Sequence, residues 1–336
     1  MNTVQSPSLR LATRRNGTRD GQLMLLDISG KRWVDASSIA QTLQALLDEW
    51  AVKVVQLEAF SREWDAKQWA TAAPFNPAEC MAPLPRAYQW ADASVYRNHA
   101  RLIYKWRKEP IPPRYEDEPL VYQGGSDVML SGTEPILARN TSHGIDLEAE
   151  IAVITTDVPM GVSAENALHH IALVVLLNDV SLRGLIPGEL SRGFGFYQSK
   201  PATSFAPIAV TPAALGNAWR QGMLHLNVNT AINGQWFGSP NAGEETVFHF
   251  GQVIAHLAQT RSLCAGSIIG AGTISNEAPE AGHACITEAR VRQMLNGIAE
   301  SELHPYLQDG DRVRIEILDA CGQTVFGAID QQVQII

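Results

Sequence analysis

The segment Gly144–Ile154, with the sequence GIDLEAEIAVI, constrains the fold of this chain more than any other stretch. It places Asp146, Glu148 and Glu150 at every second position, ahead of an apolar run. Because side chains two residues apart in a strand point to the same side, we expect the three acids to share one face of a β-strand. Neighbouring carboxylates repel each other unless a cation lies between them, and oxygen ligands suit Mg²⁺, Mn²⁺ or Ca²⁺. An edge strand whose acids face water is the alternative interpretation.

The composition favours a globular protein of the cytoplasm. The 336 residues suffice for one large domain and a small one, and 45% of them are hydrophobic. The net charge of −9 argues against a nucleic-acid partner, and the four cysteines form no CxxC motif, which favours reduced thiols. The N-terminal residues lack the apolar core of a signal peptide, and no segment has the apolar length of a membrane span. We therefore expect neither secretion nor a membrane partner.

The pattern of the chain predicts an α+β, β-rich fold in two parts. Residues 8–34 alternate as two or three short strands, residues 36–60 have helical periodicity, and the proline-rich residues 81–85 end a small N-terminal α/β or β-rich domain over 1–85. Residues 86–336 form the second domain. Many short strands are expected there, with a proline-rich loop or lid at 109–119 and a helix beginning after the N-cap Ser163. Further helices are expected at 244–261 and 290–296, and closing strands at 309–319 and 324–336.

Two further acids lie where a strand or a polar segment ends. Asp92 stands seven residues before His99 in DASVYRNH, and Asp179 closes the apolar run LLND. Together with Glu148 and Glu150 they would supply four carboxylates, enough to hold one hard cation and leave room for substrate or water. The alternatives are a helix N-cap for Asp92 and a turn cap for Asp179.

Basic and polar residues near these acids are candidates for substrate contacts. His99 is followed by a basic segment that either lines a solvated face or attracts an anion. Lys200, in the neutral stretch FYQSKPATSFAP, is either a strand-edge charge or a partner for an oxyanion. The loop GAGTISNEAP over 270–279 offers Thr273, Ser275 and backbone N–H groups to a carboxylate, or is a glycine turn.

Taken in order, these motifs resemble the fumarylacetoacetate hydrolase family, and GHACITEAR is most similar to its bacterial members. The resemblance runs from about Tyr88 to the C-terminus and is weaker over the first module. It implies a mixed β-sandwich roll with a small N-terminal domain, assembled as a homodimer. The matching stretches are DASVYRNH (92–99), GIDLEAEIAVI (144–154), NDVSLRG (178–184), SKPATSFAP (199–207), GQVIAHL (251–257), AGSIIGAGTISN (265–276), GHACITEAR (282–290) and DGDRVRIEILD (309–319).

The resemblance also implies roles for individual residues. His99 corresponds to the general base, Glu288 to the acid that orients it, and Lys200 to a lysine beside the metal. Ser204 stands where a threonine is usual. The implied ligands of a divalent metal, with Mg²⁺ preferred over Ca²⁺ or Mn²⁺, are Asp92, Glu148, Glu150 and Asp179. The implied substrate contacts are Tyr122, Arg183, Thr273 and either Arg107 or Lys108.

The function implied by the resemblance is metal-dependent hydrolysis of a carbon–carbon bond in a β-diketone acid, of the fumarylacetoacetate or acylpyruvate type, in aromatic catabolism. A small anionic oxo-acid is the expected substrate. Its identity stays open, because Ile186 and Leu190 replace a glutamine and a tyrosine of the fumarylacetoacetate-cleaving enzymes. One alternative is a 2-oxoacid decarboxylase or hydratase, which needs no His99–Glu288 pair to activate water. Another is a non-catalytic binding protein, which would have lost a ligand or the base.

Overall fold

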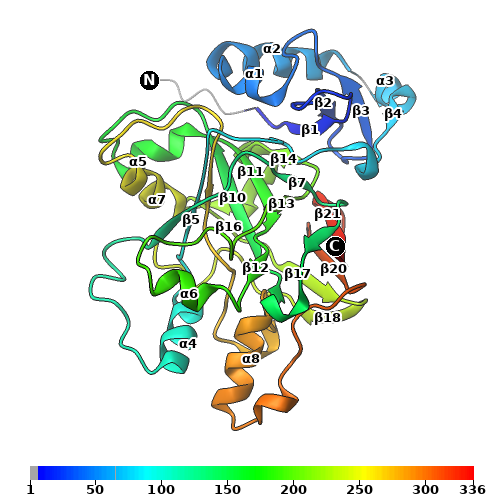
Figure 1. Cartoon of the computed structure of the whole chain (residues 1–336). Helices are drawn as coiled ribbons and strands as arrows, with labels where there is room; N and C mark the ends of the chain where they lie inside the picture. The colour runs from blue at the N-terminus through cyan, green and yellow to red at the C-terminus, as the bar shows by residue number, and fades with distance from the viewer. Residues whose placement is uncertain (1–6, 65) are drawn as a thin grey trace.

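The computed structural model describes residues 7–64 and 66–336, and a twelve-stranded mixed sheet forms its centre (Figure 1). The main path of this sheet runs, in spatial order, through β4 (Ala73–Pro74), β3 (Arg32–Asp35), β2 (Gln22–Leu26), β1 (Arg10–Arg14), β14 (Ala209–Val210), β11 (Ile171–Asn178), β10 (Ala149–Thr155), β19 (Ser267–Gly270), β5 (Gln89–Ala93) and β6 (Val121–Gly124). The short strands β13 (Ser204–Phe205) and β7 (Leu130–Ser131) extend it beside β11.

A second sheet of five strands packs against the first. Its order is β18 (Gln235–Gly238), β17 (Val228–Ile232), β20 (Arg312–Leu318), β21 (Thr324–Ile335) and β8 (Ile136–Ala138). Two small pairs, β9 (Ile145–Asp146) with β12 (Ser181–Leu182) and β15 (Trp219–Arg220) with β16 (Met223–Leu224), complete the strands outside these sheets. The predicted α+β, β-rich class is confirmed.

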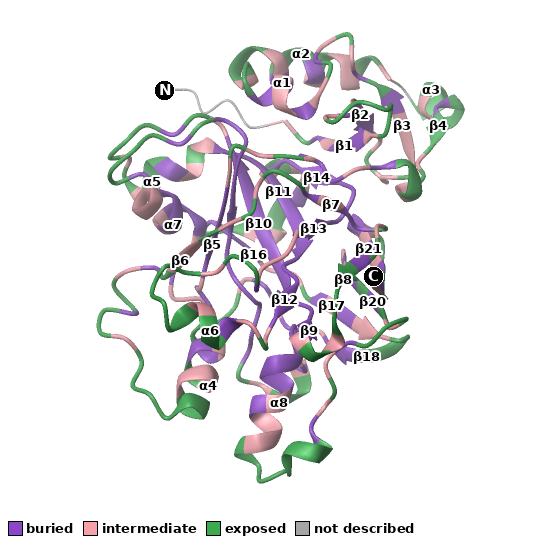
Figure 2. Ribbon diagram, in the orientation of Figure 1, coloured by how far each residue is buried: buried purple, intermediate pink, exposed green. Residues whose placement is uncertain are grey.

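The central strands are buried on both faces, which explains their continuous apolar sequence. Along β10, Ile151 and Val153 belong to a core shared with the second sheet, whereas Ala152 and Ile154 belong to a core on the other face. Figure 2 shows β10 and β11 as buried throughout. Because neither face reaches water, the acids at the ends of these strands project into a low-dielectric interior.

The N-terminal segment closes one face of the sheet. Its helices are α1 (Leu43–Leu47), α2 (Trp50–Glu63) and α3 (Ala66–Thr71), and Leu46 and Leu57 pack into the same core as Ile154. Strand β1 pairs with β14, so the sheet passes without a break from this segment into the rest of the chain. The division of the chain at 85/86 stays a prediction.

Several elements differ from their predicted bounds. The first helical stretch begins only at Leu43, because the side chain of Thr42 caps α1 there. The helix predicted over 244–261 is confined to α7 (Phe250–Leu257), since Glu245 has a positive φ of 57° and Thr246 bridges to Tyr96. The helix predicted over 290–296 begins earlier, as α8 (Ile286–Leu295).

Other predicted features agree with the structure. The side chain of Ser163 caps α5 (Ala164–Ala167), which leads through a short 3₁₀ turn into β11. Residues 109–119 contain no helix or strand. Among the described residues, no helix is long and apolar enough to span a bilayer. The prediction that there is no signal peptide concerns in part residues 1–6, which lie outside the described residues.

Candidate functional site

Four neighbouring strands bring the acidic residues together. Strands β5, β19, β10 and β11 lie side by side, and Asp92 on β5 pairs with Gly270 at the end of β19. Glu150 pairs across β10 and β11 with Leu177, and Asp179 follows directly after β11. The predicted acid strand is divided, because β9 ends at Asp146 and β10 begins at Ala149. The helix N-cap interpretation of Asp92 is wrong, since this residue lies within a strand.

Three of the four predicted ligands form one buried cluster. Carboxylate oxygens of Asp92, Glu150 and Asp179 lie within 4.8 Å of one another. Oδ1 of Asp92 accepts the backbone N–H of Gly272, but no group among the described residues hydrogen-bonds Oε2 of Glu150. Burial and the neighbouring carboxylates raise the pKa of both Asp92 and Glu150. Such a set of crowded oxygens, one of them without a partner, fits a hard divalent cation.

Glu148 lies beside this cluster and is held by two cations. Its Oε1 accepts from Arg183 at 2.6 Å and its Oε2 from Lys200 at 2.5 Å. Burial alone would raise the pKa of Glu148, but Arg183 and Lys200 keep it well below the usual range. Glu148 therefore lies in two ion pairs next to the three-carboxylate cluster, and both ion pairs favour its ionised form.

The carboxylate of Asp179 is the most heavily bonded of the set. Nζ of Lys200 lies 2.6 Å from Oδ2, the hydroxyl of Tyr122 donates to the same oxygen at 2.5 Å, and Thr203 donates to Oδ1 at 2.8 Å. Burial and the charge of Asp179 raise the pKa of Tyr122, so its phenol stays protonated as a donor. Lys200 also lies 5.1 Å from the centre of the Tyr122 ring.

His99 and Glu288 meet where two helices pack together. His99 belongs to α4 (Arg97–Arg107), which contacts α8, and its Nδ1 lies 3.5 Å from Oε2 of Glu288. This separation is long for a hydrogen bond and within the range of an ion pair. The other oxygen of Glu288 accepts from Ser275 at 2.9 Å and from Asn98 at 3.3 Å. Burial would raise the pKa of Glu288, but bonds and charges from His283 and His99 lower it to about 2.

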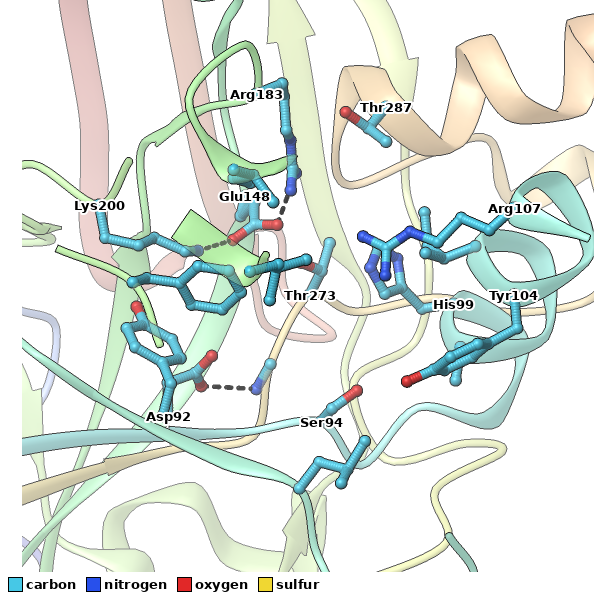
Figure 3. Close-up of a pocket in the computed structure, with 18 of the residues that line it drawn as sticks. Asp92, Ser94, His99, Tyr104, Arg107, Glu148, Arg183, Lys200, Thr273 and Thr287 are labelled. Carbon is cyan, nitrogen blue, oxygen red and sulfur yellow. Dashed lines mark hydrogen bonds and ion pairs between the residues drawn. The ribbon is translucent and has the colours of Figure 1, made fainter. Parts of the chain in front are cut away.

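Asp92, Glu148, His99 and Lys200 line one cavity of about 640 Å³. Figure 3 shows His99 and Arg107 on the side formed by α4, across the cavity from Asp92. Thr273 lies in the wall and donates to Glu150 at 3.4 Å. Of the two described residues Arg107 and Lys108, only Arg107 lines the cavity, because α4 ends at Arg107 and Lys108 caps it with a positive φ of 57°.

Much of the remaining basic segment is paired outside the cavity. Arg97 forms an ion pair with Glu116 at 3.1 Å, and Arg101 forms one with Glu277 at 2.5 Å. Arg97 and Arg101 therefore belong to the solvent-exposed face of α4, whereas Arg107 lines the cavity.

The resemblance pointed to Ser204 as a polar residue near Lys200, whereas the residue that hydrogen-bonds Asp179 is Thr203. Thr203 directly precedes β13 and Ser204 begins it, so successive side chains point to opposite sides of this extended backbone, and Ser204 accepts from Gln331 at 2.8 Å. Gln331 in turn accepts from Asn178 at 3.4 Å, and Asn178 accepts the backbone N–H of Glu148 at 3.0 Å. Ser204 thus belongs to a buried network that positions the backbone at Glu148.

Asp146, the first acid of the alternating segment, supports the site from behind. Its carboxylate accepts the N–H groups of Ile286 and Thr287 at the start of α8, at 2.7 and 3.0 Å. It also pairs with Arg183 at 2.8 Å. One side chain therefore fixes both the helix that carries Glu288 and the arginine that holds Glu148.

Comparison with known proteins matches both parts of the chain to described families. Residues 89–334 match the family model described as "Fumarylacetoacetate (FAA) hydrolase C-terminal", and residues 9–86 match "Fumarylacetoacetase N-terminal domain 2". One curated relative is the 2,4-didehydro-3-deoxy-L-rhamnonate hydrolase of Sphingomonas sp. (strain SKA58), 30% identical over 49% of this chain. The match spans about half of that relative, 54% of its length.

Two other proteins are similar over more of the chain. Oxaloacetate tautomerase YisK of Bacillus subtilis (strain 168) is 23% identical, over 76% of this chain and 83% of the relative. The crystal structure of maleylpyruvate hydrolase from Sphingobium sp. SYK-6 in complex with manganese (II) ion and pyruvate has a TM-score of 0.65 and 17% identity, covering 97% and 99% of the two chains. This likeness confirms the predicted fold.

Proposed function

The chain belongs to the fumarylacetoacetate hydrolase family, and from this premise we propose that it is a metal-dependent hydrolase cleaving a carbon–carbon bond in a β-diketone acid of the acylpyruvate or fumarylacetoacetate type. The observation that carries this proposal is that one cavity is lined both by Asp92, a member of the buried carboxylate cluster, and by His99, which faces Glu288. The cluster suits a cation, and the pair suits the activation of water.

The proposed metal ligands are Asp92, Glu150 and Asp179, with Glu148 as the fourth. Coordination by Glu148 requires its carboxylate to exchange part of its contact with Lys200 or Arg183 for the ion. When bound, a divalent cation would polarise the substrate's carbonyl oxygens as a Lewis acid and orient the dicarbonyl. The manganese and pyruvate bound by the maleylpyruvate hydrolase support this assignment, and Mg²⁺ is proposed as the native ion.

His99 is the proposed general base. Glu288 faces Nδ1 and stabilises the imidazolium that forms, which leaves Nε2 on the side of the ring away from Glu288. Nε2 accepts a proton from a water molecule as the water oxygen bonds to the acyl carbonyl carbon. The tetrahedral adduct collapses, the carbon–carbon bond breaks, and the departing fragment leaves as an enolate that takes up a proton.

Lys200 and the arginine on α4 supply positive charge to the anions. The ammonium group of Lys200, fixed between Glu148 and Asp179, lies beside the place where the enolate charge develops. The loss of one donor of this kind raises a barrier by about 3–4 kcal/mol. Arg107 is proposed to take the substrate carboxylate, and Thr273 and Tyr122 to line its path.

A tautomerase or isomerase is the second candidate, because an oxaloacetate tautomerase is among the relatives. A 2-oxoacid decarboxylase or hydratase is the third. These reactions use a metal and a proton donor, but none of them cleaves a carbon–carbon bond with water as the nucleophile. The buried carboxylate held against His99 favours hydrolysis, since its charge stabilises an imidazolium formed by taking a proton from water.

Product analysis tests the proposal. Acylpyruvates are incubated in ¹⁸O-labelled water with and without Mg²⁺, and loss of enol absorbance is followed together with the products. Hydrolysis predicts pyruvate plus a carboxylic acid carrying the label. Oxaloacetate serves as the comparison substrate. Loss of enol absorbance without cleavage products would indicate a tautomerase instead of a hydrolase. Ketonisation of oxaloacetate, with no reaction of the acylpyruvates, would lead to the same conclusion.

A homodimer and a cytoplasmic location are further proposals, both drawn from family resemblance and composition. Light scattering of the purified protein measures the first, and a mass of about twice 36.7 kDa is expected. A mass equal to one chain would reject the dimer.

A further inference from the structure

The helix that carries His99 presents an apolar face to the same cavity. His99, Ile103 and Trp106 lie at positions i, i+4 and i+7 of α4, which places them on one side of the helix. All three line the cavity. Trp106 keeps 45% of its surface exposed, although tryptophan is costly to leave in water.

A second helix adds to this wall. In α6 (Ile186–Leu190), Ile186 and Leu190 stand one turn apart and both line the cavity. Ile186 is buried, whereas Leu190 remains 40% exposed at the rim. The helix begins three residues after Arg183, so the apolar wall starts next to the charged part of the site.

Two more side chains join the wall to the carboxylate cluster. Leu120 lines the cavity beside strand β6 and is 40% exposed. Phe196 packs edge-on against the ring of Tyr122, with centroids 5.3 Å apart, and Tyr122 donates to Asp179. Apolar side chains therefore line the cavity both at its rim and beside Tyr122, which contacts the carboxylate cluster.

Among the arginine and lysine side chains that line the cavity in the described part of the chain, one has no carboxylate partner and could pair with a substrate anion. Arg183 and Lys200 are each paired with two carboxylates of the chain itself. Among the described residues, no ion pair involves Arg107, the remaining arginine of the wall. Glu109, two residues after Arg107, also lines the cavity and would repel an anion. A substrate with a single carboxylate matches this arrangement, because a second one would be buried without a partner.

We propose that α4, α6 and Phe196 form a subsite for an uncharged, apolar acyl tail, of aryl or extended alkyl type. The substrate class is then a 2-oxo acid with one carboxylate at its head and no charge on its acyl group. This inference rests on the proposed function and narrows it to acylpyruvates with apolar acyl groups. The cavity of about 640 Å³ has room for such a tail.

Binding of ligands that cannot be cleaved tests the subsite separately from catalysis. Calorimetry on the Mn²⁺-loaded protein compares 2-oxobutanoate, 2-oxohexanoate and 2-oxooctanoate, which lack the 4-carbonyl group. Each buried methylene should tighten binding about fourfold. 2-Oxoadipate, of the same length as 2-oxohexanoate but with a distal carboxylate, should bind at least about tenfold more weakly than 2-oxohexanoate. Equal or tighter binding of the dicarboxylate, or no gain with tail length, would overturn the subsite.

Two variants locate the effect on the wall. Leu190→Arg should remove most of the loss of affinity of 2-oxoadipate relative to 2-oxohexanoate, whereas the control Leu137→Arg, at the exposed position of β8, should leave that loss unchanged. Arg107→Met should weaken both six-carbon ligands by a similar factor, since Arg107 is assigned to the shared head carboxylate. A loss confined to 2-oxoadipate would show that Arg107 serves a distal carboxylate, and would refute the inference.

The outcomes separate this inference from the proposed function. If apolar tails bind preferentially but no acylpyruvate is cleaved, the subsite stands and the hydrolase proposal fails. If acylpyruvates are cleaved with a preference for carboxylated acyl groups, the hydrolase stands and the subsite fails. Absence of binding by every ligand of the series would also count against the subsite.

Discussion

Nζ of Lys200 lies 2.6 Å from Oδ2 of Asp179, at the edge of a cluster of buried carboxylates. Its charge offsets part of the repulsion among these acids. Burial alone would lower the pKa of Lys200, but the negative charges of Asp179 and Glu148 outweigh burial and raise this pKa above its usual value. The lysine is thus held protonated by the acids beside which the metal is proposed to bind. This arrangement leads to a first prediction.

Replacement of Lys200 by methionine should lower kcat by about 10²–10³, because one positive group beside the developing enolate is lost. Metal retention should persist, since the three clustered carboxylates remain. Stopped-flow turnover with Mn²⁺-loaded protein measures the change, and Lys31→Met, at an exposed position, is the matched control. A kcat within a factor of about two of the wild type would exclude this role for Lys200.

His99→Ala should retain both metal and 2-oxo-acid binding but lose turnover by about 10²–10⁴, the usual contribution of a general base. The side chain lines the cavity, and the cluster of Asp92, Glu150 and Asp179 does not include it. Metal content by elemental analysis and ligand affinity by calorimetry are measured alongside kcat. Near-wild-type kcat would rule out His99 as the base.

Glu150→Gln should abolish the increase in melting temperature that Mn²⁺ gives to the wild type. In the metal-free protein, the same change removes a buried charge from a crowded site and should leave stability equal or higher. Glu300→Gln, an exposed glutamate, is the control. Glu148→Gln should also lose metal retention if Glu148 is the fourth ligand, and unchanged metal content in that variant would remove it from the ligand set.

Glu288→Gln should lower the free energy of unfolding at neutral pH but leave it little changed near pH 2. Because the pKa of Glu288 is lowered from its usual 4.5 to about 2 in the folded protein, its ionised form stabilises the fold above pH 4.5, by on the order of 3 kcal/mol. This contribution falls away as the pH decreases toward about 2. Urea unfolding from pH 2.5 to 7 should therefore show the gap between wild type and variant closing on the acid side. A gap that is constant with pH, or grows toward acid, would contradict this account of Glu288.

The local sequence predicted the residue types of the site better than the contacts between them. The two-residue spacing of the acids and the end of an apolar strand at Asp179 are local properties, so they could be identified directly. The pairing of β19 with both β5 and β10, which places Asp92 near Glu150, depends on contacts between distant parts of the chain. No local pattern links these residues, and within the sequence only the resemblance to a family connects them.

Other contacts left no local signal. Thr203 and Ser204 are neighbours with similar side chains, and only the direction in which each side chain leaves the backbone at the start of β13 decides that Thr203 donates to Asp179. The capping of α8 by Asp146 depends on contact between segments 140 residues apart. Helix ends were misplaced where tertiary contacts override periodicity, as at Glu245.

The apolar wall shows the same limit. Ile186 and Leu190 depart from the family pattern, but the sequence does not show that their one-turn spacing places both side chains on the same cavity as those of α4. Trp106 and Phe196 carry no motif, and their place in the wall follows from the packing of the two helices and the loop after α6.

The most direct test of the central claim is an anomalous-scattering map from crystals grown with Mn²⁺ and oxalate. We expect one manganese peak bound directly by oxygens of Asp92, Glu150 and Asp179, with oxalate on the side that faces His99. The same map shows whether Glu148 joins the coordination sphere. A manganese peak away from these three carboxylates, or none in fully loaded crystals, would contradict the claim that they form the metal centre of this protein.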